Sequence, residues 1–200
     1  MPTLKESHIE MVISRSAEIL PSDFRRIRAY ALVSLYLGAG LRTIEMCHAK
    51  LSNLDLTEGG STIYLDHVKG NDSYGEPRIV VIIPDFVPAI KRYLYARSNL
   101  LQKEEVNTDA LFFSLDNYAP LSDKTVRQIR MIVESDLSVK FDGRECRRTY
   151  GQYLKDCGVS IENVSINMGH TSTKTTERYY ARQRNDRAVS ETFATLRCMK

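Results

Sequence analysis

Hydrophobic side chains recur at helical spacing over most of the chain, and this pattern predicts a mainly α-helical fold. The first expected helix covers residues 3–19, with Thr3 or Ser7 as its N-cap. A second helix is expected to start at 21–22 and to end at the sequence GAG, residues 38–40. Its apolar residues fall on one face, which consists of Ile27, Ala31, Leu32, Leu35 and Tyr36.

Two β-branched segments interrupt the helical pattern, TIYLD at 62–66 and RIVVII at 78–83. A polar loop with two glycines separates them, so they are expected to pair as a hairpin or small antiparallel sheet that ends at Pro84. Gly158 is expected to end one later helix, and Ser160 to cap the next. The remaining expected helices cover 42–48, 85–102, 122–137, 145–157, 160–168, 173–181 and 187–197. The fold class predicted is therefore mainly α with a small antiparallel β-sheet.

Composition narrows the class of protein only slightly. Two hundred residues make one large domain or two small ones, and the net charge of +3 is too small to prove a polyanionic partner. No apolar run reaches the ~18 residues that cross a bilayer, and the N-terminus does not resemble a signal peptide, so a cytoplasmic protein is expected. The cysteines lack a CxxC pair, which favours reduced, partly buried thiols over disulfides or a zinc site: Cys47, Cys146, Cys157 and Cys198.

Arginines gather in two places along the chain. RYYARQRNDR at 178–187 contains four arginines, and GRECRR at 143–148 contains three. Such clusters suit phosphate groups, although by themselves they make nucleic-acid binding only somewhat more probable than a solvated surface. Arg144 and Arg147 also stand near the start of an expected helix, where the helix dipole disfavours cations. A conflict of this kind between sequence and local preference is typical of a functional site.

Attack on a phosphodiester is a reaction that would use the scattered arginines, lysine, histidine and tyrosine together. Guanidinium groups stabilise the negative charge that builds on the phosphate oxygens, and a loop lysine such as Lys69 can protonate the leaving oxygen. A tyrosine, here Tyr179 or Tyr180, can act as the nucleophile. A histidine such as His170, or a cation that lowers the tyrosine pKa, would help to remove its proton. Fixed cations hold the phosphate in this scheme, and no His and carboxylate cluster has ligand spacing. No metal and no other cofactor is therefore expected.

Three segments and the position of one tyrosine together resemble the tyrosine recombinases, the family of phage integrases and Xer-like enzymes. GAGLRTIEM is similar to the family's first box, and HVKGNDSYGEPRIVVI to the hairpin that carries a general-acid lysine. GRECRRTYGQYLKDCGVSIENVSINMGH resembles the second box, and the family places its nucleophile nine residues after the final histidine. The resemblance runs from about residue 5 to 195. It implies these catalytic residues: Arg42, Lys69, Arg144, Arg147, His170 and the nucleophile Tyr179, with Glu45 in support.

The resemblance also implies a tyrosine recombinase catalytic-domain fold over 1–200, without the N-terminal core-binding domain of the family. Arg144 stands where the family usually has histidine, so it is expected to stabilise the phosphate or the phenolate and to leave proton removal to His170 or water. Double-stranded DNA is the implied partner, bound by a homo-tetramer that forms from free monomers. Further DNA contacts are expected from Arg148, Lys174, Arg178 and Arg182.

Two other functions remain open from the sequence. A type IB topoisomerase uses the same chemistry but rejoins the original strand. A decayed recombinase fold would bind DNA without cutting it. The integrase-like second box argues against the first, and the complete set of catalytic residue types argues against the second.

Overall fold

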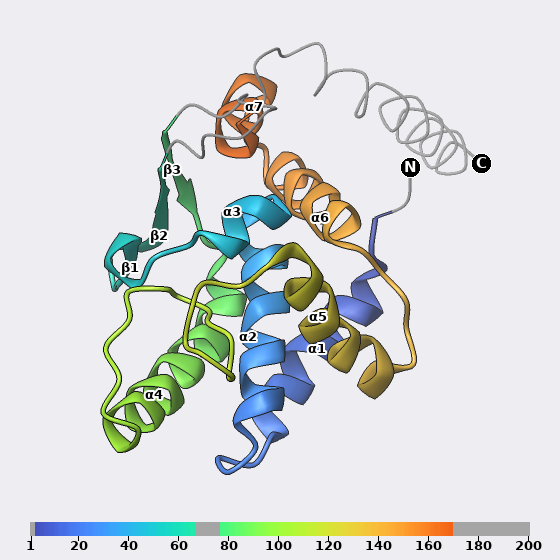
Figure 1. Cartoon of the computed structure of the whole chain (residues 1–200). Coiled ribbons are helices and arrows are strands. Elements are labelled where there is room, and N and C mark those ends of the chain that lie inside the picture. Colours follow the sequence, from blue (N-terminus) through green and yellow to red (C-terminus); the bar gives the residue numbers. More distant parts are fainter. Residues whose placement is uncertain (1–2, 67–76, 170–200) are drawn as a thin grey trace, which may run out of the picture.

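The computed structural model describes residues 3–66 and 77–169 (Figure 1), and it confirms a mainly α fold with a small antiparallel sheet. The helices are α1 (Glu6–Glu18), α2 (Phe24–Ala39), α3 (Thr43–Cys47), α4 (Val87–Lys103), α5 (Asp123–Leu137), α6 (Gly143–Asp156) and α7 (Ile161–Met168). The strands are β1 (Leu54–Thr57), β2 (Gly60–Leu65) and β3 (Arg78–Val81), and short 3-10 turns cover Leu51–Asn53 and Pro84–Phe86.

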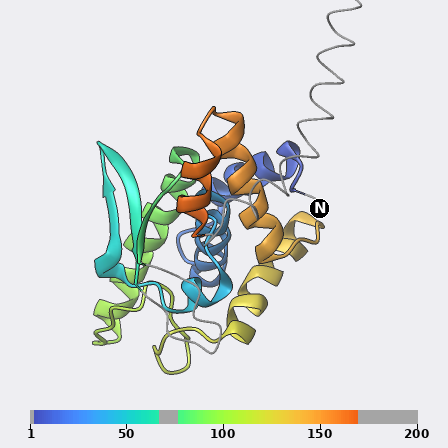
Figure 2. The same cartoon turned by 90° about the horizontal axis from the view of Figure 1, so that it is seen from above.

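Helix α2 is the centre of the molecule, with other helices around it (Figures 1 and 2). It contacts α1, α4, α5 and α6, so every residue from Ile27 to Ala39 is buried. The five residues of the predicted apolar face are buried, and the other sides of the helix are buried as well. A helix surrounded by partners needs small or apolar side chains on all sides, and here Ser34, Gly38 and Ala39 complete the buried surface.

Side-chain caps set several helix starts a few residues away from the predicted ones. Asp23 accepts the Arg26 N–H at 3.1 Å, so α2 begins at Phe24 rather than at 21–22. Asp142 accepts the Glu145 N–H at 2.7 Å, so α6 begins two residues earlier than predicted. Ser160 caps α7 as predicted. The predicted caps of the first helix were wrong, because α1 starts after Lys5 without a side-chain cap.

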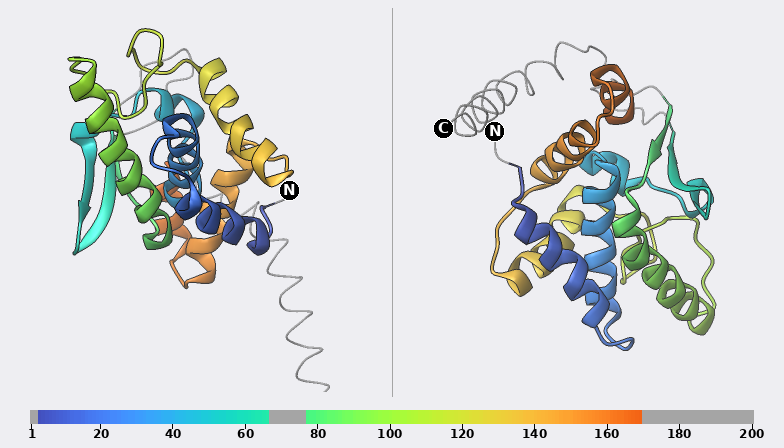
Figure 3. Two further views of the ribbon diagram at one scale, coloured as in Figure 1. Left: turned by 90° about the horizontal axis from the view of Figure 1, so that it is seen from below. Right: turned by 180° about the vertical axis from the view of Figure 1, so that it is seen from behind.

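The sheet has three strands in the order β1-β2-β3, all antiparallel. The hairpin of β2 and β3 was predicted, although β3 ends at Val81 rather than at residue 83. Strand β1 was missed because its alternation lasts only four residues, with Leu54 and Leu56 packed on the core. The sheet lies at one side of the helices, beside α4 and α3 (Figure 3).

Helices α6 and α7 pack against each other, and α7 also packs against β3. Gly158, with φ of +85°, directly follows the Cys157 cap of α6, as expected for the glycine that ends this helix. Gly169, with φ of +59°, ends α7 in the same left-handed conformation. The helices predicted at 173–181 and 187–197 lie outside the described residues.

The described cysteines are free thiols. Cys47 and Cys146 are buried and Cys157 is exposed, whereas Cys198 lies outside the described residues. Burial raises the pKa of Cys47 to about 11, so this thiol stays protonated at neutral pH. Within residues 3–66 and 77–169, no helix is both long and apolar enough to span a membrane.

Replacing Gly40 tests whether the junction between α2 and α3 requires a residue without a side chain. Gly40 ends α2 with φ of +60°, and a Cβ added there would lie 2.4 Å from Cδ1 of Tyr150. We expect Gly40→Ala to lower the free energy of unfolding by about 2–4 kcal/mol, from left-handed strain and overpacking together. Urea unfolding followed by circular dichroism measures this loss. The control is Gly59→Ala, where no atom lies within 4 Å of the added Cβ and the change should stay within about 0.5 kcal/mol. Equal losses in both variants would contradict the account.

Candidate phosphate-binding site

The first two residues of the site follow the end of α2 in the sequence. After the left-handed turn at Gly40, Arg42 precedes α3 and Glu45 lies in the first turn of that helix. The Glu45 carboxylate accepts the Arg42 backbone N–H at 2.7 Å and pairs with its guanidinium at 2.8 Å. Sequence analysis predicted that these two residues work together, and the structure joins them. One third of the Arg42 side chain is exposed, so its guanidinium is accessible from outside.

Helix α6 brings Arg147 to the same place from 105 positions further along the chain. Its Nη1 donates to the Gly40 carbonyl at 2.6 Å and lies 3.9 Å from Oε2 of Glu45. Its Nη2 donates to the carbonyl of Met168 at the end of α7. The helix dipole disfavours cations at the start of α6, where these arginines lie. Anionic side chains nearby, among them the Asp142 cap, offset this effect.

The other two arginines of α6 differ from Arg147 in exposure. Arg144 is exposed in the first turn, three residues before Arg147 and thus on the same helix face. Arg148 is half-buried and engaged with neighbouring groups. The structure therefore gathers Arg42, Glu45 and Arg147 into one cluster and leaves Arg144 at its exposed border.

A third guanidinium, which sequence analysis missed, comes from Arg78 at the start of β3. Its Nη2 lies 2.8 Å from Oε1 of Glu45, and its Nε donates to the Asn167 carbonyl at 3.1 Å. The Arg78 side chain is only 8% exposed. Strand alternation was the available signal, because Arg78 falls on the same sheet face as the buried Val80. An arginine at an inward-facing strand position requires a buried partner.

Glu45 is the electrostatic centre of these contacts. Burial tends to raise the pKa of Glu45, but Arg78 and Arg147, together with the Arg42 backbone N–H and guanidinium, outweigh burial and hold it below its ordinary value. Three guanidiniums around one carboxylate leave two positive charges in excess. Such a cluster attracts an anion with several acceptor oxygens, as a phosphate group has.

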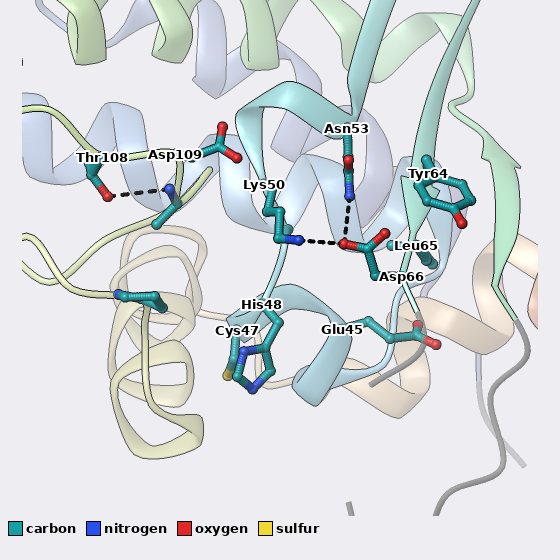
Figure 4. Close-up of a pocket in the computed structure, with 13 residues that line it drawn as sticks. Glu45, Cys47, His48, Lys50, Asn53, Tyr64, Leu65, Asp66, Thr108 and Asp109 are labelled. Carbon is teal, nitrogen blue, oxygen red and sulfur yellow. Dashed lines mark hydrogen bonds and ion pairs between the residues drawn. The ribbon is translucent and has the colours of Figure 1, made fainter. Parts of the chain in front are cut away.

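A cavity of about 530 Å³ borders the cluster and reaches the end of β2 (Figure 4). Glu45 and His48 line the cavity from one side. Asp66, which directly follows β2, lines it from another. Lys50 pairs with Asp66 at 2.6 Å just after the end of β2. Of the clustered residues, Glu45 is the one that lines this cavity.

The remaining predicted site residues lie outside the described part of the chain: Lys69, His170, Lys174, Arg178, Tyr179, Tyr180 and Arg182. His170 directly follows Gly169 in sequence, and the Gly169 carbonyl accepts a 2.6 Å hydrogen bond from Nη2 of Arg42. In the described ranges, no group of three or more His, Cys, Asp or Glu side chains is arranged to hold a metal ion.

Removing the Glu45 charge is expected to destabilise the domain in a pH-dependent way. Glu45→Gln should lower the free energy of unfolding by about 3 kcal/mol at neutral pH, because buried guanidiniums lose their counter-charge. The lowered pKa means that this stabilisation is present above the ordinary value of 4.5 and is lost as the pH falls through the folded-state pKa.

Urea unfolding at a series of pH values measures both effects. The gap between wild type and Glu45→Gln should be constant from neutral pH down to about pH 5 and should narrow below that. Glu58→Gln, at an exposed turn, is the control and should follow wild type throughout. A gap that does not change with pH would show that the carboxylate charge is unimportant.

Comparison with known sequences places this arrangement in a family. The chain matches the model of the phage integrase family over residues 3–186. The tyrosine recombinase XerA of Pyrococcus furiosus is 27% identical over 179 residues, which cover 88% of this chain and 57% of the relative. XerC of Thermodesulfovibrio yellowstonii is 30% identical over 158 residues, which cover 76% of this chain and 49% of the relative. The chain therefore spans about half the length of these curated relatives.

Solved structures show the same fold. A crystal structure of XerA recombinase superposes with a TM-score of 0.73 at 24% identity, covering 98% of this chain and 65% of that one. XerH recombinase in a post-cleavage complex with its difH substrate gives a TM-score of 0.72 at 20% identity, covering 94% and 52%. The family predicted from the sequence motifs is confirmed: the chain belongs to the phage integrase family of tyrosine recombinases.

Proposed function

We propose that the chain is the catalytic domain of a site-specific DNA recombinase that cleaves and rejoins strands through a 3′-phosphotyrosyl intermediate. One observation carries the proposal: Arg42 and Arg147, far apart in sequence, meet around Glu45 at the end of α7. These are the two arginines that the family resemblance assigns to the phosphate. Their position beside an exposed cationic helix start suits a DNA strand laid across the cluster.

In the first step, the phenolate of Tyr179 attacks the scissile phosphorus. The new bond joins the tyrosine oxygen to phosphorus while the bond to the 5′-oxygen breaks. Lys69 protonates the departing 5′-oxygen, and the tyrosine proton passes to His170 or to water. Arg42, Arg147 and Arg144 stabilise the charge on the non-bridging oxygens.

In the second step, the 5′-hydroxyl of another strand attacks the phosphotyrosine and releases Tyr179. The energy of the phosphodiester is conserved in the link, so the cycle consumes neither ATP nor a metal-activated water. Rejoining with a new strand distinguishes recombination from the closure of a single nick by a type IB topoisomerase.

Double-stranded DNA is the proposed partner, and recombination between two duplexes calls for four copies of the chain. Further contacts to DNA are assigned to Arg148, Lys174, Arg178 and Arg182. Because these contacts displace counterions, affinity should fall steeply with salt. The 200 residues are proposed to act as one catalytic domain on DNA in the cytoplasm.

Negatively supercoiled plasmid in EDTA tests the chemistry. Wild type and Tyr180→Phe should relax the plasmid and leave protein covalently on DNA after a detergent stop. Tyr179→Phe should do neither, and Arg147→Gln should slow covalent capture by about 100-fold or more, because a guanidinium that stabilises transition-state charge is lost. Gel electrophoresis with and without protease measures both products.

Each other outcome has a definite meaning. An inactive Tyr180→Phe beside an active Tyr179→Phe would keep the mechanism and move the nucleophile by one residue. Activity that requires Mg²⁺ would contradict the metal-free mechanism. A silent wild type that still binds the plasmid would contradict catalysis and favour a decayed recombinase retained for DNA binding.

A further inference from the structure

The last three carbonyls of the α7 terminus each accept a hydrogen bond from a different arginine. Asn167 accepts from Arg78 at 3.1 Å, Met168 from Arg147, and Gly169 from Arg42 at 2.6 Å. Carbonyls at a helix C-terminus lack partners within the helix and carry partial negative charge, so cations are favoured there. The end of α7 is thus tied to the same guanidiniums that surround Glu45.

Arg78 occupies the most enclosed place in this arrangement. The same oxygen of Glu45, Oε1, lies 2.8 Å from both Arg78 and Arg42. The Arg78 side chain is 8% exposed, against 33% for Arg42, so Arg78 lies behind the cluster and Arg42 at its opening. A phosphate that approaches from outside meets Arg42 before it reaches Arg78.

Gly169 is fitted directly onto the Arg78 guanidinium. A Cβ at residue 169 would lie 2.7 Å from both Cζ and Nη1 of Arg78. The left-handed backbone favours glycine here, and the guanidinium would have to move to admit a side chain. The end of α7 at Gly169 therefore packs directly on the Arg78 guanidinium.

We propose that Arg78 is a positioning residue of the recombination reaction: it locks Glu45 to the end of α7 and so holds Arg42 and Arg147 in phosphate-binding geometry without touching DNA. This inference rests on the proposed function. It assigns Arg78 a role that acts through the two phosphate-binding arginines.

The loss of Arg78 should affect the cleavage rate more than DNA affinity. Without its guanidinium, Glu45 loses one of the two cations on Oε1, and the Asn167 carbonyl loses its donor. Arg42 and Arg147 keep their charges, so attraction of DNA persists. A displacement of about 1 Å in catalytic groups is enough to slow chemistry about 100-fold.

Three variants separate positioning from folding. Arg78→Gln removes the charge, and Arg78→Lys keeps the charge but lacks the planar fork that bridges two acceptors. Arg92→Gln is the matched control, because Arg92 also donates to carbonyls at a helix end, those of Ser16 and Ala17 in α1. The end of α1 adjoins the start of α2. The junction with α3 lies at the other end of α2, about 24 Å away along the helix axis.

Covalent capture of supercoiled plasmid in EDTA gives the rate, and a fluorescent duplex cut from that plasmid gives the affinity. Arg78→Gln should slow capture about 100-fold with affinity within about threefold of wild type. Arg78→Lys should capture DNA about 10-fold more slowly than wild type, and so faster than Arg78→Gln. Arg92→Gln should capture DNA at the wild-type rate. Wild-type rates in both Arg78 variants would overturn the proposal, and so would a loss of affinity as large as the loss of rate. If Arg78→Gln does not fold, a wild-type rate in Arg78→Lys alone overturns it.

A second readout does not depend on activity. The Glu45 carboxylate faces the guanidiniums of Arg42, Arg78 and Arg147, and its titration can be followed by ¹³C NMR. Arg78→Gln should raise the pKa of Glu45, whereas Arg92→Gln should leave it as in wild type. If wild type does not cut DNA, the proposed function fails on its own, and the titration still tests the link between Arg78 and Glu45. An unchanged Glu45 titration in Arg78→Gln would overturn the proposal in either case.

Discussion

The site depends on the ion pairs between one buried carboxylate and several guanidiniums. Glu45 is 6% exposed and meets Arg42, Arg78 and Arg147, which come from the N-cap of α3, from β3 and from α6. Cations brought this close repel one another, and the carboxylate offsets that repulsion only while it is ionised. The excess positive charge that remains is the basis of the phosphate binding that we propose.

The fold serves mainly to bring these segments together. Helix α2 is enclosed by its neighbours, and its end at Gly40 points the chain into α3 while offering a carbonyl to Arg147. Helix α7 closes the arrangement, because its final carbonyls accept from the same arginines. Displacing any one of these elements therefore disturbs the geometry of the others. The parts of the site are therefore linked through shared partners.

Periodicity predicted the helices of the described region. The spaced motifs predicted that Arg42, Glu45 and Arg147 lie together. Both signals can be read from short stretches of the sequence. The surroundings of α2 were not predictable, since its neighbours come from four separate segments. Arg78 was missed because the family resemblance assigned it no role and strand alternation does not identify its partner, Glu45. Strand β1 was too short for its alternation to be distinguished from a turn. The catalytic roles of Lys69, His170 and Tyr179 stay predictions.

The central claim is that this cluster presents a DNA phosphate to a tyrosine of the same chain. Mass spectrometry of the covalent complex, after nuclease and protease digestion, measures this most directly. The account predicts a nucleotide attached through its 3′-phosphate to the peptide that contains Tyr179, in wild type and not in Glu45→Gln, in which the arginines lose their common anchor. A nucleotide on a residue other than tyrosine, or an equal yield from Glu45→Gln, would contradict it.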